Sequence, residues 1–212
     1  MNILDVIQGG YEWQLARAGS LGASQIADAL AKTKSGWGAS RKNLHARLVT
    51  ERLTGEPTES YCSPAMQWGK DCEPQARAMY SFATGNKVAE IGLAFHPAIK
   101  GTHASPDGLC NDDGLVEIKC PNSATHIETL TGAPIADRYV KQMLWQMRIC
   151  DRAWCDFVSF DPRMPEEMQL HIQRVERDDD LIAEMEAEII AFLAEVDATV
   201  ADLRARYMRE AA

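Results

Sequence analysis

Two acids and a lysine with strand spacing are the residues of this sequence best suited to chemistry. They lie in the stretch 101–121, which reads as two strands (102–110 and 114–120) joined by a polar turn at 111–113. With this three-residue turn, Asp107 lies opposite Glu117, and opposed residues have Cβ atoms about 5 Å apart. Two carboxylates so placed can share one cation. A tighter turn at Asp113-Gly114 would instead shift the register by an odd step and turn Glu117 to the other face.

The period of a strand adds Lys119 to the same patch. Glu117 and Lys119 face one way, whereas Val116 and Ile118 face the core. Mg²⁺ prefers carboxylate and carbonyl oxygens and keeps several waters, and a lysine with a lowered pKa can hold or deprotonate the attacking water. This set suits metal-assisted hydrolysis of a phosphodiester. The alternative is an ordinary surface hairpin, because the pattern D-x9-E-x-K is not specific by itself.

The spacing of apolar residues predicts further helices and strands before and after this hairpin. A first helix is expected after Ser24 and a second from Ser40 to about Gly55. Ser24 and Ser40 are expected to cap the N-termini of these two helices. The second helix carries a basic row, which is either phosphate-facing or simply solvated: Arg41, Lys42, Arg47 and Arg52. A long helix is predicted at 64–84, where Pro74 must kink it or begin a fresh segment.

The remaining elements alternate in type. We expect strands at 87–95, 153–161 and 168–173 and helices at 134–150 and 178–209, with 121–132 largely irregular. His171 falls on the solvated face of its strand, and the role of His103 is left undecided. The last helix has an apolar seam that suits either a coiled coil or packing across the core. This order predicts a mixed sheet flanked by helices, built as a single domain over residues 1–212.

Composition sets further bounds. The chain has 212 residues, is 46% hydrophobic and carries a net charge of −9, which by itself would not suggest nucleic acid. Eleven acids and four arginines lie in 176–212, so most of the negative excess is in the tail and a basic groove is possible elsewhere. Six dispersed cysteines without C-x-x-C, and no visible export signal or membrane-spanning run, favour a cytosolic protein with reduced core cysteines.

The central motif resembles a known family of nucleases. Ser105-Pro106-Asp107-Gly108 followed by Glu117-Ile118-Lys119-Cys120-Pro121 is similar to the PD-(D/E)XK nucleases, and most similar to the lambda-type, YqaJ-like exonucleases of phage recombination systems. The resemblance spans about residues 11–178. Further matching stretches follow in the same order: 13–17 with 22–24, 68–73 with Ala76-Arg77, 139–142, and 160–164.

The resemblance implies a restriction-endonuclease-like α/β fold and a Mg²⁺-dependent exonuclease, with Mn²⁺ as a substitute ion. Such an enzyme digests double-stranded DNA from the 5′ end and leaves a 3′ single strand for single-strand annealing recombination. The family forms ring-shaped homotrimers and works with a single-strand annealing protein. A phage or prophage protein of this kind acts in the cytoplasm of its bacterial host.

The resemblance also implies roles for residues outside the acid–lysine set. It makes Glu73 an active-site carboxylate rather than a helix-terminal acid, adds the carbonyl of Ile118 to the metal ligands Asp107 and Glu117, and places Gln142 beside Lys119. The 5′-phosphate pocket is predicted at Arg17, Ser24 and Lys34, although the lambda-type pattern has arginine at the last position. Met66 takes the place of an apolar wedge between bases.

Three alternatives belong to other classes. A structure-specific or restriction-type endonuclease would share the metal site and would cut closed circular DNA. A DNA-binding module with a dead nuclease site would need a broken acid–lysine set, yet Asp107, Glu117 and Lys119 are all present. A coiled-coil interaction protein would account for the last helix alone.

Overall fold

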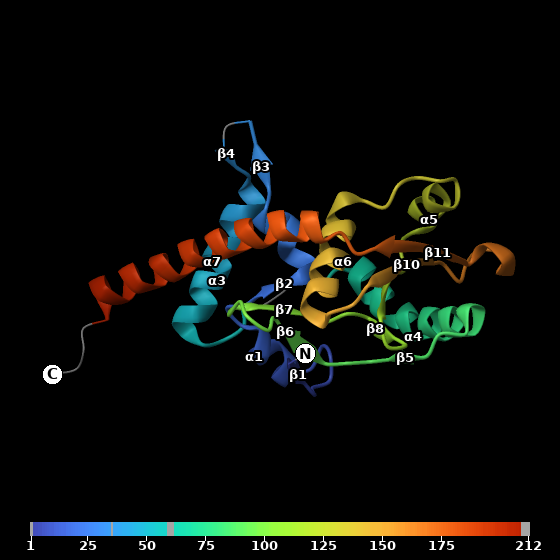
Figure 1. The fold of residues 1–212 in the computed structure, drawn as a ribbon, viewed down its shortest axis with the longest axis horizontal. Helices are drawn as coiled ribbons and strands as arrows, with labels where there is room; N and C mark the ends of the chain where they lie inside the picture. Colours follow the sequence, from blue (N-terminus) through green and yellow to red (C-terminus); the bar gives the residue numbers. More distant parts are fainter. Residues whose placement is uncertain (1, 35, 59–61, 209–212) are drawn as a thin grey trace.

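A five-stranded mixed sheet with helices on both faces forms the centre of the protein, as shown by a computed structural model that describes residues 2–34, 36–58 and 62–208 (Figure 1). The strand order is β11-β10-β9-β8-β5, and only β9 and β10 run parallel within it. The strands are β5 (Val88–Ala89), β8 (Gly108–Cys110), β9 (Gly114–Lys119), β10 (Trp154–Phe160) and β11 (Leu170–Glu176). The predicted fold class, a mixed sheet flanked by helices, is confirmed.

The β8–β9 hairpin has the register that the three-residue turn predicts. Gly108 pairs with Val116 and Cys110 with Gly114, so position 107 falls opposite position 117. The predicted first strand at 102–110 is nevertheless broken. Pro106 has no amide donor for a strand ladder, and the residues before it form β7 in a second sheet.

The second sheet has the order β1-β6-β7-β2. Its strands are β1 (Asn2–Leu4), β2 (Leu21–Gly22), β6 (Leu93–Phe95) and β7 (Thr102–Ala104). The predicted strand at 87–95 is therefore divided between the two sheets as β5 and β6. Between α2 (Ile26–Ala29) and α3 (Ala39–Thr54) the chain forms a small projecting hairpin of β3 (Lys32–Thr33) and β4 (Gly36–Trp37) (Figure 1).

Helix α4 (Pro64–Thr84) covers one face of the five-stranded sheet. Its buried residues Cys72, Ala76 and Tyr80 pack in one cluster with Val116 and Ile118 of β9. The helix passes through Pro74 without starting a fresh segment, so that alternative was wrong. At its N-terminus the Ser63 side chain is the cap and accepts a hydrogen bond from the Met66 amide at 3.2 Å. At its C-terminus Gly85 ends the helix in the left-handed conformation, with φ 73°.

The other face carries the larger core. Helices α2 (Ile26–Ala29), α3 (Ala39–Thr54), α6 (Asp137–Cys150) and α7 (Asp179–Tyr207) pack there. The predicted seam of α7 is buried in this core and is thus used within the chain: Ile182, Met185, Ile189, Phe192 and Val196. Asp178 caps α7 by accepting from the Leu181 amide at 2.9 Å, and the predicted end at residue 209 lies outside the described residues.

Short helices were the least predictable elements. The structure adds α1 (Tyr11–Arg17), α5 (Ser123–Leu130) and the 3-10 turns η1 (Ala23–Gln25) and η2 (Glu166–Met168). Ser24 is not a cap, because it lies inside η1 after Gly22, and Ser40 is not one either, because Gly38 precedes α3. Glycine fills both cap positions, where it is also accepted.

We expect Phe192→Ala in α7 to lower the free energy of unfolding by about 3–5 kcal/mol, the usual cost of removing a fully buried aromatic ring. Phe192 is fully buried, whereas Ile190 on the same helix is 49% exposed. Ile190→Ala is the matched control and should cost about 1 kcal/mol or less. Urea unfolding measures both, and equally small effects would contradict the packing of α7 against the core.

Candidate active site

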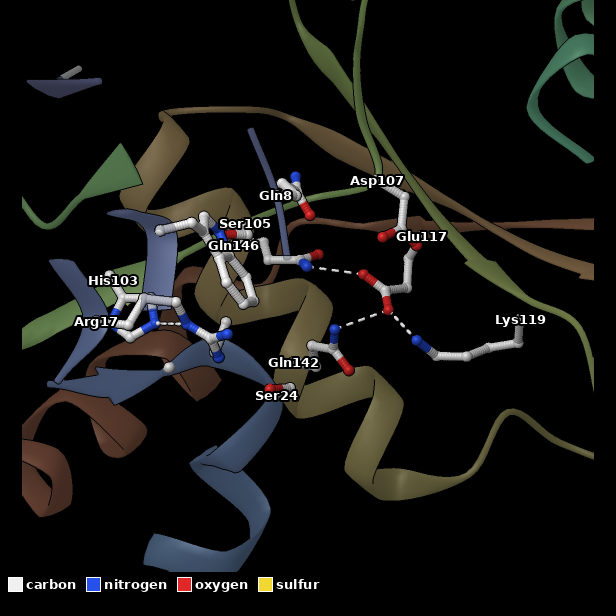
Figure 2. Close-up of a pocket in the computed structure, with 13 residues that line it drawn as sticks. Gln8, Arg17, Ser24, His103, Ser105, Asp107, Glu117, Lys119, Gln142 and Gln146 are labelled. Atoms are coloured by element: carbon white, nitrogen blue, oxygen red, sulfur yellow. Dashed lines mark hydrogen bonds and ion pairs between the residues drawn. The ribbon is translucent and has the colours of Figure 1, made fainter. Parts of the chain in front are cut away.

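Asp107 and Glu117 lie together where the two sheets meet (Figure 2). Asp107 immediately precedes β8, and its Oδ2 accepts a hydrogen bond from the Ile118 amide at 2.6 Å. Glu117 lies near the end of β9 and is only 1% exposed. The pairing predicted from the hairpin register therefore brings two carboxylates to one place.

Helix α6 supplies the groups that hold Glu117. Gln142 donates from Nε2 to Oε1 of Glu117 and Gln146 donates from Nε2 to Oε2, each at 2.7 Å. Lys119 forms an ion pair with the same carboxylate, and its Nζ lies 5.1 Å from the centre of the Tyr139 ring. Gln142 and Lys119 thus meet at the same oxygen, Oε1 of Glu117. Gln146 was missed, although two glutamines four residues apart on a buried helical face were a readable signal.

Burial and like charge dominate the electrostatics of this cluster. Burial, together with the charge of Glu117, raises the pKa of Asp107 well above its ordinary value. Burial also raises the pKa of Glu73, although the neighbouring Arg77 opposes this. For Lys119 burial lowers the pKa, but Glu117 and Asp107 outweigh it and leave the pKa raised. The site accordingly favours an added positive charge.

The donor set fits a hydrated hard cation. Within the described part of the chain, no group of three or more His, Cys, Asp or Glu side chains forms a closed metal site. Mg²⁺ does not need one, because one or two carboxylates and retained waters suffice for it. Asp107 and Glu117 would hold the ion, and the carbonyl of Ile118 remains a predicted third ligand.

Glu73 reaches the cluster from α4. It pairs with Arg77, which also donates from Nε to the Asp107 carbonyl at 3.0 Å and pairs with Glu90 at 2.8 Å. Glu73 lines the same cavity of about 530 Å³ as Asp107 and Lys119. The structure therefore brings this predicted carboxylate to the acid–lysine set.

Two further cavities extend the site towards the N-terminal elements. One of about 190 Å³ is lined by Arg17 and Ser24 as well as by Asp107, Glu117 and Lys119. Figure 2 shows Arg17 and Ser24 on the opposite side of this space from the carboxylates. Another cavity of about 310 Å³ also includes Arg17 and Ser24 and continues to Met66 and Lys70.

Met66 is 52% exposed and lines both the 310 Å³ and the 530 Å³ cavity. Its position beside the site is compatible with the predicted wedge. Lys34 is different, because it is exposed in the turn of the β3–β4 hairpin and is not among the residues that line these cavities. Within one chain, the predicted phosphate pocket thus gathers Arg17 and Ser24 but not Lys34.

His103, undecided from the sequence, is the partner of Arg17. It is 2% exposed, accepts from Nε of Arg17 at 2.9 Å, and lies with Nδ1 2.8 Å from Oγ of Ser20. The Arg17 guanidinium also stacks 3.7 Å over the Trp13 ring. No signal in the sequence joins residues 17 and 103, because β2 and β7 pair only in the folded chain.

Two other buried polar residues, Asp156 and His126, make hydrogen bonds within the fold. Asp156 binds Tyr80 at 2.7 Å and Arg174 at 2.8 Å, and His126 bonds Ser159 and the Met168 carbonyl, each at 2.8 Å. All six cysteines are free, but Cys62 is exposed, so the expectation of core cysteines does not hold for it. None of the helices in the described part of the chain is both long and apolar enough to span a membrane.

Fold and site together define a class of protein. Residues 12–153 match the YqaJ-like viral recombinase domain, and the chain belongs to this family. It is similar to an alkaline exonuclease, LHK-Exo from Laribacter hongkongensis, with 49% identity, 93% of this chain and 97% of that chain covered, and a TM-score of 0.87. The structure of LHK-Exo in complex with dAMP matches at 50% identity with the same coverage and TM-score. The resemblance found in the sequence is confirmed.

A more distant structure shows the same fold. The phage related exonuclease from Haemophilus somnus 129PT has 14% identity and a TM-score of 0.66, with 87% of this chain and 96% of that chain covered. Among proteins with curated descriptions, none matches this chain.

The buried imidazole predicts a specific pH dependence of stability. Burial, with Arg17 and Arg47 nearby, lowers the pKa of His103 from 6.5 to about 3. Between these values the unfolded chain binds a proton that the folded chain does not, so His103 costs stability as pH falls, by about 1.4 kcal/mol per pH unit at most.

We therefore expect His103→Gln to lose less stability than the parent between pH 6.5 and 3, even if it is less stable at pH 7. Urea unfolding at several pH values compares the two proteins. A difference in unfolding free energy that stays constant over this range would contradict a neutral buried His103.

Proposed function

We propose that this protein digests duplex DNA from the 5′ end of one strand, with Mg²⁺ as its ion, and leaves a 3′ single strand. Family membership and the likeness to an alkaline exonuclease of 49% identity make the chain a DNA exonuclease. The finer features rest on the site. The observation that carries them is one cavity lined both by the acid–lysine set and by Arg17 and Ser24.

This cavity has the chemistry for the terminal nucleotide of a strand. Arg17 offers donors to an anion on one side, and the carboxylate cluster would hold the scissile phosphate, through a cation, on the other. A cut there releases a mononucleotide, and dAMP, the ligand in the structure of the similar LHK-Exo, is of this kind. Because the terminal anion would bind at Arg17 and the scissile phosphate at the carboxylates, the strand could enter the site in one orientation only.

The 530 Å³ cavity would take the strand on the other side of the cut. Lys70 of α4 and Arg138 of α6 are exposed cations that line this cavity. Arg138 is held against Tyr139, 4.6 Å from the centre of its ring. Neither cation has an ion pair with an acid in the described residues, so both are available to phosphates.

When bound, Mg²⁺ would supply positive charge to the phosphate oxygens and increase the nucleophilicity of water, and Mn²⁺ could replace it. Asp107 and Glu117 would position the ion, and Gln142 and Gln146 would fix the Glu117 carboxylate. Lys119 is an ammonium here, and it would orient the attacking water or serve as base once added positive charge lowers its pKa. Glu73 would be the third carboxylate of the site, beside Asp107 in the 530 Å³ cavity.

Several features of the proposal rest on the family resemblance alone. They are a homotrimeric ring around the DNA, cooperation with a single-strand annealing protein, and action in the cytoplasm of a bacterial host. The role of Met66 as a wedge between bases also comes from the resemblance, but its exposure beside the cavities supports it as well.

An endonuclease with the same metal site is the second candidate. It is favoured by the 530 Å³ cavity, which continues away from Arg17 and does not itself require an end. A linear duplex labelled separately at each strand end separates the two. The proposed exonuclease releases the 5′ label first as a mononucleotide, needs Mg²⁺, and leaves closed circles intact. Cutting of closed circles, or release of the 3′ label first, would contradict it.

Asp107→Ala should keep the fold and reduce hydrolysis by at least about a thousandfold, because too few anionic oxygens remain for a hydrated ion. Asp137→Ala removes an exposed carboxylate from α6, outside the cluster, and is the matched control. Turnover of both variants is measured over a range of Mg²⁺ concentrations. Restoration of the Asp107→Ala rate by excess Mg²⁺ would show that Asp107 is not a required ligand.

A further inference from the structure

Arg17 is a half-buried cation that has no acidic partner in the described chain. Its guanidinium instead donates a hydrogen bond to the His103 ring and stacks on the Trp13 ring, and both of these rings are neutral. Burial, and then the charge of Arg47, lowers its pKa to about 10. A guanidinium in this state gains most from an anion that enters the cavity beside it.

The hydrogen bonds of His103 fix how Arg17 is presented. A guanidinium has no acceptor, so Nε2 of His103 must accept from Arg17, and the imidazole hydrogen must lie on Nδ1, towards Oγ of Ser20. Nε of Arg17 is thereby used, and its terminal nitrogens remain for the cavity. Gly22 keeps this arrangement open, since a Cβ there would lie 3.0 Å from Nε2 of His103 and 3.5 Å from Nη2 of Arg17.

Arg47 of α3 lines the same 310 Å³ cavity as Arg17 and Ser24. Its nearest acid is Glu51, at 4.0 Å. That carboxylate is already bound to the Gly19 amide at 2.8 Å and to the amide and hydroxyl of Thr58 at 3.2 and 2.7 Å. Nη2 of Arg47 is buried and has no hydrogen-bond partner within the described part of the chain. Arg47 is thus a second guanidinium on the wall of this cavity, and its hydrogen-bonding capacity is not filled by the described residues.

We propose that Arg47, rather than Lys34, is the second cation that binds the terminal 5′-phosphate, and that His103 is the positioning residue for Arg17. The inference rests on the proposed recognition of a 5′ end and names the residues that perform it. Two guanidinium groups with one hydroxyl at Ser24 suit a phosphate monoester, which carries about two negative charges. An internal diester carries one, and a 5′-hydroxyl carries none.

The test compares duplexes with a 5′-phosphate and a 5′-hydroxyl, as initial digestion rates and as binding affinities in EDTA, where no turnover occurs. The parent should prefer the phosphate. Arg47→Ala should reduce this preference about tenfold, the usual effect of one charge-assisted hydrogen bond, and Arg47→Lys should lie between them because it keeps the charge but loses the fork. Lys34→Ala should keep the preference of the parent.

Arg206→Ala is the control for removal of one positive charge, because Arg206 is exposed on α7 and paired with Asp202 at 2.8 Å. Thermal unfolding of each variant confirms that it is folded. A parent without preference would contradict the proposed end recognition itself. A parent with preference, retained in Arg47→Ala, would overturn the role of Arg47 and leave end recognition standing. Loss of preference in Lys34→Ala would overturn the exclusion of Lys34.

The positioning role of His103 has a separate readout. His103→Gln keeps an acceptor for Nε of Arg17 and should retain most of the preference for phosphate, whereas His103→Leu removes the acceptor and should lose it about as Arg17→Ala does. The ratio of the two substrates cancels any general loss of active protein. Equal preference in the Gln and Leu variants would show that His103 does not act through Arg17.

Discussion

The burial of like charges at the junction of the two sheets is the constraint on which the site depends. Asp107 and Glu117 are brought together by the hairpin register, and burial, with the charge of Glu117, raises the pKa of Asp107 and makes its ionisation costly. The chain does not remove this cost by pairing every oxygen with a cation. It fixes Glu117 with two neutral glutamines and a lysine, which orients the carboxylate and leaves the cluster short of positive charge.

The distribution of the remaining charges explains how an acidic protein can bind DNA. Acids of α7 pair with arginines of the core helices: Glu195 with Arg41, Asp197 with Arg52, and Glu186 with Arg148. Two members of the basic row on α3 are thereby used for packing, and a third, Arg47, faces the cavity. The negative excess of the tail is thus partly neutralised away from the site, and a net charge of −9 says little about the local field.

The sequence predicted the hairpin register, the long helices and the acid–lysine set because each depends on near neighbours and on a clear period. It did not predict the separation of the strands into two sheets, since a single residue without an amide, Pro106, decides where a ladder ends. Gln146 was readable from its spacing to Gln142. The pairing of Arg17 with His103 was not, because 86 residues separate them and the segment after Arg17 meets β7 only when β2 pairs with it in the folded chain.

Helix α6 joins two parts of the site that would act on different partners, the DNA strand and the ion. Its first turns place Arg138 and Tyr139 on the wall of the 530 Å³ cavity, and the following turns carry Gln142 and Gln146 to Glu117. A helix transmits a small displacement along its length as a rigid body, so a strand seated against Tyr139 would also change how Glu117 is held. Such coupling is reciprocal. The strength with which this enzyme holds its ion would then depend on whether DNA is present, and the ion would tighten its hold on DNA by the same factor.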